Sequence, residues 1–368
     1  MRIGISTRGL KQGSYAISSI VYHLTQSILN LASKKHEIFL YFNQTKLEAL
    51  FPSTAHKRSI RLRNRFIWDH AWLPMALRSD HLDIALFMKG TMPFLLPCPG
   101  AVIVHDLGYF DHQIRPYRYM ETLYMKNMIY RASRRARLLF ADSEYTRCEA
   151  IRILGTDPKK ISVCYPDCSS IYRLIQDTNT LLEIKSRYDL PQEFILAPTS
   201  LSPRKNLERI LNAFELIKHQ IPHHLAITGG QSWGVKDLVK RIHSDSSHRI
   251  RVLGAVPDEH MPALYNLASF AIYPSLLEGF GLPILEAFRC GCPILTSNNT
   301  SMPEVAGDAA YLIDPYDTNQ LSEGMLKLAN DPKLRQDMIS KGFQRAQFFS
   351  WEKSAHIILD KLEHLASI

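Results

Sequence analysis

Short apolar segments alternate with amphipathic helical segments along the whole chain, and the alternation occurs in two separate runs. In the first run the strand-like segments are Arg2–Ser6, Glu37–Phe42, Ile84–Met88, Val102–His105, Leu138–Asp142 and Ile161–Cys164. In the second run they are Phe194–Ala197, Leu225–Thr228, Ile250–Leu253, Phe270–Tyr273, Pro293–Thr296 and Tyr311–Ile313. Buried strands that alternate with helices form parallel sheets with helices on both faces. The sequence therefore predicts an α/β protein with two doubly wound, Rossmann-like domains.

The domain boundaries follow from the length and from a gap between the two runs. A chain of 368 residues suits two domains, and residues 166–192 lose clear apolar periodicity, so we place a hinge there. We predict an N-terminal domain over residues 1–175, a C-terminal domain over residues 190–345, and a C-terminal helix over residues 346–368 that packs back toward the N-terminal domain. Ligands of such sheets bind at the carboxyl ends of the strands. The expected site is therefore a cleft across which the two domains face each other.

Positive charge is concentrated in the first half of the chain. The formal net charge is +9, and residues 1–190 contain 27 Lys and Arg against 16 Asp and Glu, whereas residues 191–368 contain 17 against 19. A basic surface attracts anionic lipid, phosphate-bearing substrates or nucleic acid, although it can also be a solvated surface without a partner. No helix-turn-helix, zinc-finger or aromatic RNA-binding signature accompanies it, so we do not expect a nucleic-acid partner.

Cysteine usage and hydropathy indicate the compartment. The six cysteines are sparse and lack the spacing of a zinc site or a C-x-x-C redox motif, so reduced thiols are expected. The N-terminus resembles a first strand and not a signal peptide, and no apolar run approaches the roughly 20 residues that span a bilayer. We expect a cytoplasmic protein that associates peripherally with the anionic inner membrane face through its basic half.

The most informative segment, residues 275–293, follows the predicted strand Phe270–Tyr273. Pro283 near the start and Gly291 after the end delimit a short predicted helix, Leu282–Cys290. Glycines in the preceding turn allow close approach of a ligand, and the free N–H groups of the first helical turn suit a diphosphate.

Two carboxylates, Glu278 and Glu286, flank this turn. A carboxylate does not bind phosphate, but it accepts hydrogen bonds from hydroxyls, and a nucleotide sugar has hydroxyls on both sides of its diphosphate. One carboxylate can therefore hold the sugar and the other the ribose. The alternative is a glycine turn with two surface glutamates.

Two further clusters follow predicted strands. Arg204 and Lys205 follow the strand Phe194–Ala197 and open a helix, where cations oppose the helix dipole. This mismatch favours a role in neutralising a diphosphate leaving group. His105 ends a strand of the first domain and is expected to face the cleft, the alternative being a histidine bonded locally.

With these residues the chain resembles the retaining glycosyltransferases of the large bacterial mannosyl- and glucosyltransferase family (glycosyltransferase family 4, "group 1"), which have the GT-B fold. The Glu-x7-Glu segment from Glu278 to Glu286 carries the resemblance. Supporting matches are Arg204-Lys205-Asn206, Leu253-Gly254-Ala255-Val256-Pro257, Met302-Pro303-Glu304-Val305 and Phe349-Ser350-Trp351-Glu352.

The resemblance implies a role for each candidate residue. Arg204 and Lys205 would bind the donor diphosphate and stabilise its departure, Glu278 would contact hydroxyls of the transferred sugar, and Glu286 would hold the ribose. His105 would lie near the sugar. Backbone groups and the nucleobase contact would come from Gly279, Phe280, Gly281, Leu282 and Val256.

The loop after the first strand departs from the family pattern. Many relatives have a Gly-Gly pair where this chain has Gly9-Leu10-Lys11-Gln12-Gly13-Ser14. The resemblance implies that this loop, with Gly13, approaches the donor phosphate or the acceptor.

The resemblance implies a retaining hexosyltransferase of cell-surface polysaccharide synthesis, such as that of lipopolysaccharide. It would move a hexose, with mannose favoured, from a GDP- or UDP-linked donor to a saccharide or lipid-linked saccharide. The sequence contains no Asp-x-Asp, so no metal or other cofactor is expected. Two alternatives are a nucleotide-sugar epimerase of the same fold, which would form a second product without acceptor, and a basic nucleic-acid-binding protein.

Overall fold

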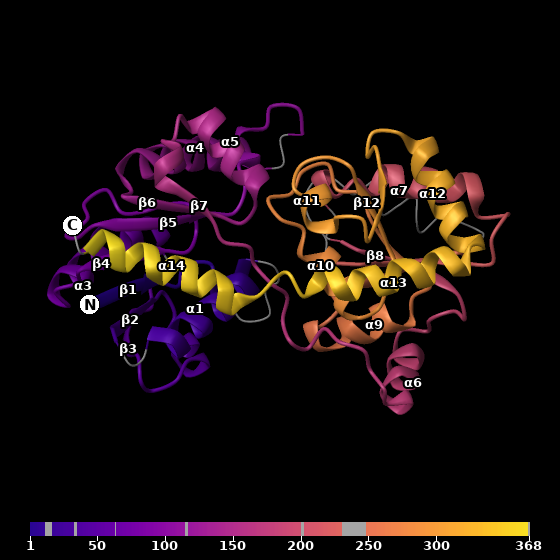
Figure 1. The fold of residues 1–368 in the computed structure, drawn as a ribbon, viewed down its shortest axis with the longest axis horizontal. Helices are drawn as coiled ribbons and strands as arrows, with labels where there is room; N and C mark the ends of the chain where they lie inside the picture. The colour runs from indigo at the N-terminus through magenta and orange to yellow at the C-terminus, as the bar shows by residue number, and fades with distance from the viewer. Residues whose placement is uncertain are drawn as a thin grey trace. The chain divides into compact units, whose positions relative to one another are not determined.

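The chain divides into two units, each built on a parallel sheet. The computed structural model describes residues 1–11, 17–32, 35–62, 64–114, 117–199, 202–229 and 248–366. The N-terminal unit comprises Met1–Asp111, Tyr117–Asp167 and Phe349–Ile368, and the C-terminal unit comprises His112–Pro116 and Cys168–Phe348 (Figure 1). Residues 168–175, which were expected in the N-terminal domain, thus belong to the C-terminal unit.

A seven-stranded parallel sheet forms the frame of the N-terminal unit, with the order β3-β2-β1-β4-β5-β6-β7. Its strands are β1 (Arg2–Ser6), β2 (Glu37–Phe42), β3 (His56–Ser59), β4 (Ile84–Phe87), β5 (Gly100–Val104), β6 (Leu138–Ala141) and β7 (Ile161–Val163). Its helical segments are α1 (Ile17–Ala32), η1 (Thr45–Leu50), α2 (Arg65–Ile67), η2 (Trp68–Trp72), α3 (Leu73–Ser79), η3 (Gly108–Phe110), α4 (Tyr119–Arg135), α5 (Glu144–Leu154), η4 (Pro158–Lys160) and α14 (Trp351–Ala366). Because all the strands are parallel, their carboxyl ends lie at one edge of the sheet.

The last helix of the chain packs on the first one within this unit (Figure 1). Ile358 and Leu362 of α14 are fully buried in the same apolar cluster as Val21 and Ile28 of α1. Helix α14 therefore supplies part of the core that covers β1.

Strand β3 was not predicted from the sequence. It reads His-Lys-Arg-Ser and, among the described strands, pairs with β2 alone at the sheet edge. An edge strand with exposed faces needs no apolar residues, so hydropathy could not reveal it.

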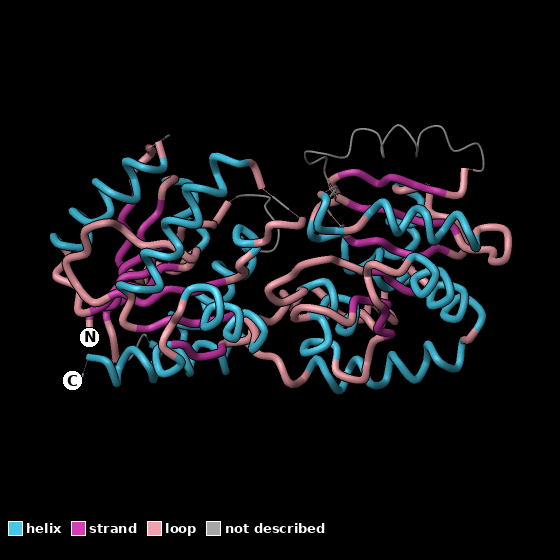
Figure 2. The backbone as a smooth tube through the Cα atoms, turned by 90° about the horizontal axis from the view of Figure 1, so that it is seen from above, coloured by secondary structure: helices cyan, strands magenta, loops and turns pink. Residues whose placement is uncertain are grey.

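A six-stranded parallel sheet forms the frame of the C-terminal unit, with the order β10-β9-β8-β11-β12-β13. Its strands are β8 (Phe194–Pro198), β9 (His224–Thr228), β10 (Ile250–Gly254), β11 (Phe270–Tyr273), β12 (Ile294–Ser297) and β13 (Tyr311–Ile313). The described helical segments are α6 (Thr178–Arg187), η5 (Pro203–Lys205), α7 (Leu207–Ile217), η6 (Asp258–His260), α9 (Met261–Leu267), α10 (Leu282–Arg289), α11 (Met302–Ala306), α12 (Thr318–Asn330) and α13 (Pro332–Ala346) (Figure 2).

Helix α6 lies in the stretch that was predicted to be an aperiodic hinge. Asp177 caps it by accepting a hydrogen bond from the backbone N–H of Asn179 at 3.0 Å. Ile184 is its one buried residue, so the helix has almost no apolar face and its periodicity is absent from the sequence.

The prediction of an α/β chain with two parallel sheets is confirmed. None of the helices in the described ranges combines the length and the apolar character needed to cross a bilayer.

Candidate active site

The loops after β8 and β11 meet because these strands are neighbours in the C-terminal sheet. The first loop contains η5 with Arg204 and Lys205, and the second contains Glu278. The backbone N–H of Leu276 donates to the carbonyl of Arg204 at 2.8 Å, which joins the two loops directly. Residues more than 70 positions apart in the sequence are thus held at one sheet edge.

Glu278 is the centre of a buried ionic cluster. Arg204 Nη1 lies 3.0 Å from Glu278 Oε2, and Lys205 Nζ lies 2.6 Å from Oε1. Ser275 Oγ donates to Oε1 at 2.6 Å, and Lys205 Nζ also donates to the Tyr273 hydroxyl at 2.5 Å. Each carboxylate oxygen is therefore engaged, and the Glu278 side chain is only 9% exposed.

These contacts determine the protonation state of Glu278. Burial alone would raise its pKa, but the charges of Arg204 and Lys205 and the hydrogen bonds from Lys205 and Ser275 lower the pKa to about 2. Glu278 is consequently an ionised carboxylate at neutral pH, which only accepts hydrogen bonds.

Three side chains that sequence reasoning did not assign to the site hold the second loop in place. Ser301 Oγ donates to the carbonyls of Glu278 at 3.0 Å and Phe280 at 2.8 Å. Ser297 Oγ donates to the carbonyl of Ser275 at 2.7 Å, and Asn206 Nδ2 to that of Pro274 at 3.0 Å. Asn206 stands beside the two cations in the sequence, but nothing in a single sequence distinguishes these serines from surface hydroxyls.

Helix α10 begins directly after this loop. Gly281 is its N-cap residue, with a φ of 106° that favours glycine, and Gly279, Phe280 and Leu282 are buried around it. The helix ends one residue earlier than predicted, at Arg289, and Gly291 with a φ of 65° follows it. The first-turn N–H groups of α10 thus lie next in the chain to the Glu278 cluster.

Glu286 is on the second turn of α10 and has a different environment from Glu278. Burial raises its pKa to about 7, although hydrogen bonds with Tyr265 and Tyr172 and the charge of Lys205 oppose the rise. The Tyr265 hydroxyl donates to Glu286 Oε2 at 2.9 Å. The two carboxyl groups of this segment therefore differ in protonation near neutral pH.

The remaining predicted residues lie elsewhere. Val256 is buried in the loop between β10 and η6. Gly13 lies outside the described residues. His105 belongs to the N-terminal unit, where it follows β5.

Both ring nitrogens of His105 are bonded within its own unit. Nδ1 lies 2.7 Å from Asp142 Oδ2, and Nε2 lies 2.7 Å from the Met88 carbonyl. Burial lowers the pKa of His105, but Asp142 and the Met88 carbonyl outweigh it, and the pKa is raised overall. A carboxylate and a carbonyl both accept hydrogen bonds, so these two contacts and the raised pKa favour the charged form of the ring.

No three His, Cys, Asp or Glu side chains come together as a possible metal site within the described part of the chain. Metal independence stays a prediction from the sequence.

Comparison with known proteins identifies similar chains. Residues 181–345 match the family model described as "Glycosyl transferases group 1". The chain is 35% identical to O-antigen chain mannosyltransferase B of Escherichia coli over 62% of this chain and 61% of that protein. It is 32% identical to the serotype-specific mannosyltransferase WbdA of Escherichia coli over 50% of this chain and 23% of that protein. The chain thus spans about three fifths of the first relative's length and less than a quarter of the second's.

Solved structures resemble the whole chain. Sucrose-phosphate synthase from Thermosynechococcus elongatus superposes with a TM-score of 0.77 at 16% identity, covering 100% of this chain and 99% of that chain. WaaG, a glycosyltransferase involved in lipopolysaccharide biosynthesis, gives a TM-score of 0.73 at 16% identity, covering 98% and 99%. At these identities the likeness shows the fold, which is GT-B.

Proposed function

We propose, from the match of residues 181–345 to the family model of the glycosyl transferases group 1, that this protein is a retaining hexosyltransferase. Its donor is a nucleoside-diphosphate sugar, with mannose favoured as the hexose. Its acceptor is a saccharide or lipid-linked saccharide of cell-surface polysaccharide synthesis. Relatives named as mannosyltransferases support this choice.

One observation carries the proposal: two cations converge on one buried carboxylate beside the start of α10. Arg204 and Lys205 lie within 3.0 Å of Glu278. A diphosphate bound there would take up the positive charge of both side chains and the N–H groups of the first helical turn. Glu278, released from part of its pairing, would accept hydrogen bonds from hydroxyls of the sugar.

The transfer step breaks the bond between the anomeric carbon and the diphosphate oxygen, and the electron pair leaves with the diphosphate. The acceptor oxygen forms the new bond on the same face of the sugar, and its proton passes to the leaving diphosphate. Arg204 and Lys205 stabilise the charge that develops on this leaving group. No protein nucleophile is required in this front-face reaction.

The other predicted residues keep the roles that the family resemblance implies. Glu286 would hold the ribose hydroxyls, and Val256 would lie near the nucleobase. His105 would lie near the sugar, with its two ring nitrogens held by Asp142 and the Met88 carbonyl. Gly13, which lies outside the described residues, would approach the donor phosphate or the acceptor, as the resemblance implies.

Measurements of nucleotide binding and of sugar transfer would identify the donor. GDP and UDP are each titrated with the full chain, and GDP-mannose and UDP-glucose are then tested with and without a saccharide acceptor. We expect one nucleotide to raise the Tm and one donor to give an α-linked product. Absence of nucleotide binding together with absence of transfer or donor hydrolysis would overturn the proposal. An epimerase would instead form a second nucleotide sugar without acceptor.

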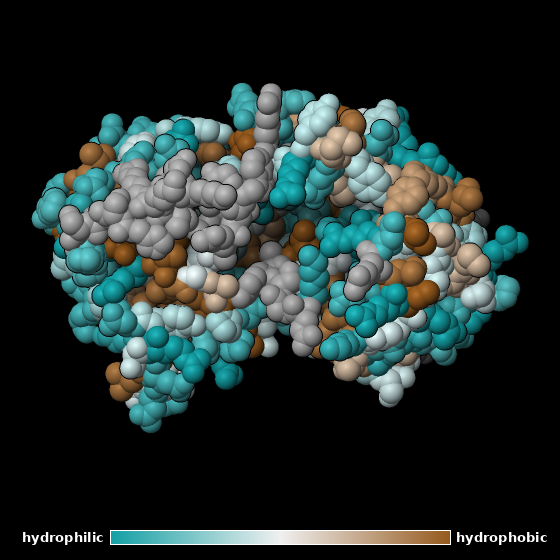
Figure 3. Space-filling view, turned by 180° about the vertical axis from the view of Figure 1, so that it is seen from behind, coloured by the Kyte–Doolittle hydropathy of each residue, from teal (hydrophilic) through white to brown (hydrophobic). Residues whose placement is uncertain are grey.

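We also propose that helix α4 brings the N-terminal unit to an anionic membrane surface. Met120, Leu123 and Tyr130 are 73%, 52% and 46% exposed on one face of α4, and Arg131 and Arg134 are exposed near its end. On the face drawn in Figure 3, hydrophobic residues lie among hydrophilic ones. Apolar residues combined with arginines suit a bilayer interface that contains anionic lipid.

A further inference from the structure

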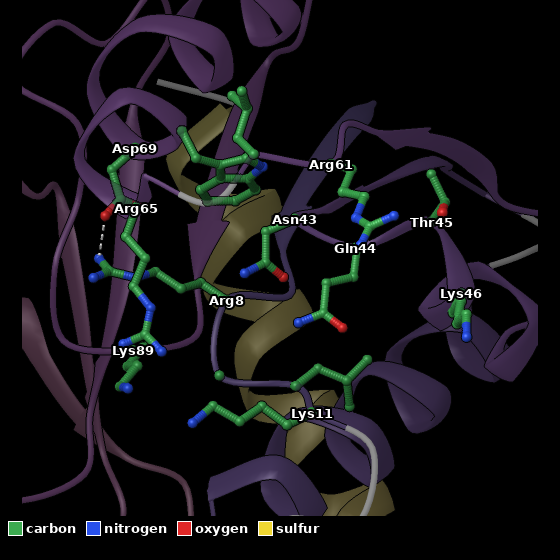
Figure 4. Close-up of a pocket in the computed structure, with 14 residues that line it drawn as sticks. Arg8, Lys11, Asn43, Gln44, Thr45, Lys46, Arg61, Arg65, Asp69 and Lys89 are labelled. Atoms are coloured by element: carbon green, nitrogen blue, oxygen red, sulfur yellow. Dashed lines mark ion pairs between the residues drawn. The ribbon is translucent and has the colours of Figure 1, made fainter.

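The N-terminal unit contains a cavity of about 590 Å³, which we call the basic pocket. It is lined by side chains that follow β1, β2, β3 and β4, at the carboxyl edge of the parallel sheet (Figure 4). Its volume lies within the range of small-molecule sites. Pockets at this edge of a parallel sheet commonly bind ligands.

Positive charge dominates the lining. Its cations are Arg8, Lys11, Lys46, Arg61, Arg65 and Lys89. One carboxylate, Asp69, opposes them, and its Oδ2 lies 2.7 Å from Arg8 Nη1. The charges of Lys89 and Arg65 also act on Asp69, although neither forms a close ion pair with it among the described residues.

Four of these cations surround the same space. Arg8 is fixed by Asp69 and by Thr91, whose Oγ1 accepts from Arg8 Nη1 at 2.8 Å. Figure 4 shows the ends of Lys11, Arg65 and Lys89 on the same side of the pocket as Arg8. Positive charges that lie so close together repel one another unless an anion compensates them.

The pKa of Lys89 reflects the closeness of the other cations. Burial first, and then the charges of Arg8, Arg65 and Lys11, lower its pKa to about 8. An anion in the pocket would reverse the repulsion and favour the charged form of Lys89. Asp69 is the one carboxylate among the lining residues, so the pocket keeps an excess of positive charge that an anion would balance.

We infer that the basic pocket binds a phosphoryl group, as phosphate or diphosphate, carried by the acceptor of the proposed transferase. The inference rests on the proposed function. Arg65 and Lys89 would bind the phosphoryl oxygens, since a guanidinium and an ammonium both donate to them. Asn43, Gln44 and Thr45 line the same pocket and suit the hydroxyls of an attached sugar. The cations line a hollow and not a flat face, so the inference commits to a discrete molecule and not to a membrane surface.

Binding of inorganic pyrophosphate tests the pocket without any sugar transfer. The full chain is titrated calorimetrically while saturating GDP or UDP, whichever binds, occupies the donor site. We expect Arg65→Gln and Lys89→Gln each to weaken pyrophosphate binding about tenfold, the loss of one charge-assisted hydrogen bond. Arg78→Gln and Lys159→Gln make the same charge change on exposed residues of the same unit outside the pocket, and they should bind as the wild type does.

Acceptor kinetics then test the assignment to the acceptor. One saccharide is offered as an alkyl diphosphate conjugate, as a 1-phosphate and as a neutral alkyl glycoside. We expect kcat/KM to favour the phosphorylated forms through a lower KM, and Lys89→Gln to reduce this preference about tenfold with the donor KM unchanged. A preference that requires the alkyl chain identifies a lipid-linked source, and equal use of the 1-phosphate identifies a soluble one.

Failure of the pocket inference can be distinguished from failure of the transferase proposal. Equal pyrophosphate binding by the pocket and control variants, or equal use of the neutral glycoside, overturns the pocket inference and leaves the transferase proposal standing. Absence of transfer overturns the transferase, and with it the assignment to an acceptor. If Lys89→Gln weakened binding to phosphatidylglycerol vesicles and not to pyrophosphate, the pocket would belong to lipid headgroups and the inference would fail.

Discussion

Lys205 and Arg204 share one carboxylate, yet Lys205 is more deeply enclosed. Its side chain is 11% exposed against 23% for Arg204, and it also donates to Tyr273. A cation held this way is positioned before the substrate arrives, which is the condition for effective stabilisation of a leaving group.

Replacing Lys205 therefore tests the leaving-group role. We expect Lys205→Ala to lower kcat by about 10²–10³, because one preorganised group that stabilises the developing charge is lost. Steady-state kinetics with the identified donor provide the measurement. Lys327→Ala, the same change at an exposed position of α12, should leave kcat unchanged, and a near-normal kcat for Lys205→Ala would remove this residue from the mechanism.

Glu286 predicts a pH dependence of donor binding. Its pKa is raised from 4.5 to about 7, so the ionised form that accepts hydrogen bonds from ribose increases as the pH rises through 7. If that form binds, donor affinity should fall by about tenfold for each pH unit below 7. Titration of wild type and Glu286→Gln between pH 5.5 and 8.5 would show this slope in the wild type alone, and an equal slope in both would refute it.

The loop that precedes α10 depends on backbone geometry as much as on charge. Gly281 has a φ of 106°, and an added Cβ would lie 3.3 Å from Ile284 Cδ1. The neighbour is a flexible side-chain end, so the main cost of a substitution is conformational.

We expect Gly281→Ala to destabilise the protein by about 1–2 kcal/mol and to weaken donor binding, because the first-turn N–H groups are displaced. Urea unfolding and nucleotide titration measure the two effects. Gly155→Ala in the N-terminal unit, where φ is 62°, should lose similar stability and keep its donor affinity. Unchanged donor binding by Gly281→Ala would mean that this helix start does not contact the donor.

The proposed contact of helix α4 with an anionic membrane predicts binding that depends on salt. Co-sedimentation with phosphatidylglycerol vesicles should be strong at low salt and weak at high salt, because screening removes the attraction of arginines to anionic lipid. Leu123→Asp should reduce it several-fold, whereas Leu182→Asp, at a 62% exposed position of α6, should not. Vesicle binding that changes neither with salt concentration nor with the Leu123→Asp substitution would contradict a membrane role for α4.

At the scale of the whole molecule, the N-terminal unit is completed by the last residues of the chain. Ile358 of α14 is fully buried in its core, whereas the adjacent Ile357 is 36% exposed. We expect Ile358→Ala to cost about 2–5 kcal/mol and Ile357→Ala about 1 kcal/mol or less.

Urea unfolding measures these free energies, and hydrogen exchange shows which elements the substitution destabilises. In Ile358→Ala, the amides of β1 and α1 should exchange faster than those of β8 and β11. Equal losses for the two isoleucines would show that α14 does not complete this core.

The sequence predicts elements well where burial is periodic and poorly where it is not. β1 (Arg2–Ser6) and β11 (Phe270–Tyr273) match their predicted bounds because the buried residues of both strands, all but Arg2, are apolar or small. β3 and α6 were missed because an exposed edge strand and a mostly exposed helix carry little hydropathy pattern. The sequence allows charged site residues to be predicted at strand ends. It does not reveal Ser297 and Ser301, whose hydroxyls donate to backbone carbonyls of the loop before α10.

What the sequence alone determined is local: alternating apolar segments that require parallel sheets, and a glycine turn between Glu278 and Glu286 that suits a phosphate and two sets of hydroxyls. The tertiary structure decided which distant groups meet. Pairing of β8 with β11 brings Lys205 to Glu278. Burial and neighbouring charge then separate two chemically identical carboxyls into a permanent anion and a group that titrates near pH 7. The physical reason is that electrostatic energies depend on distance and solvent exposure, and neither quantity is defined until the chain has folded.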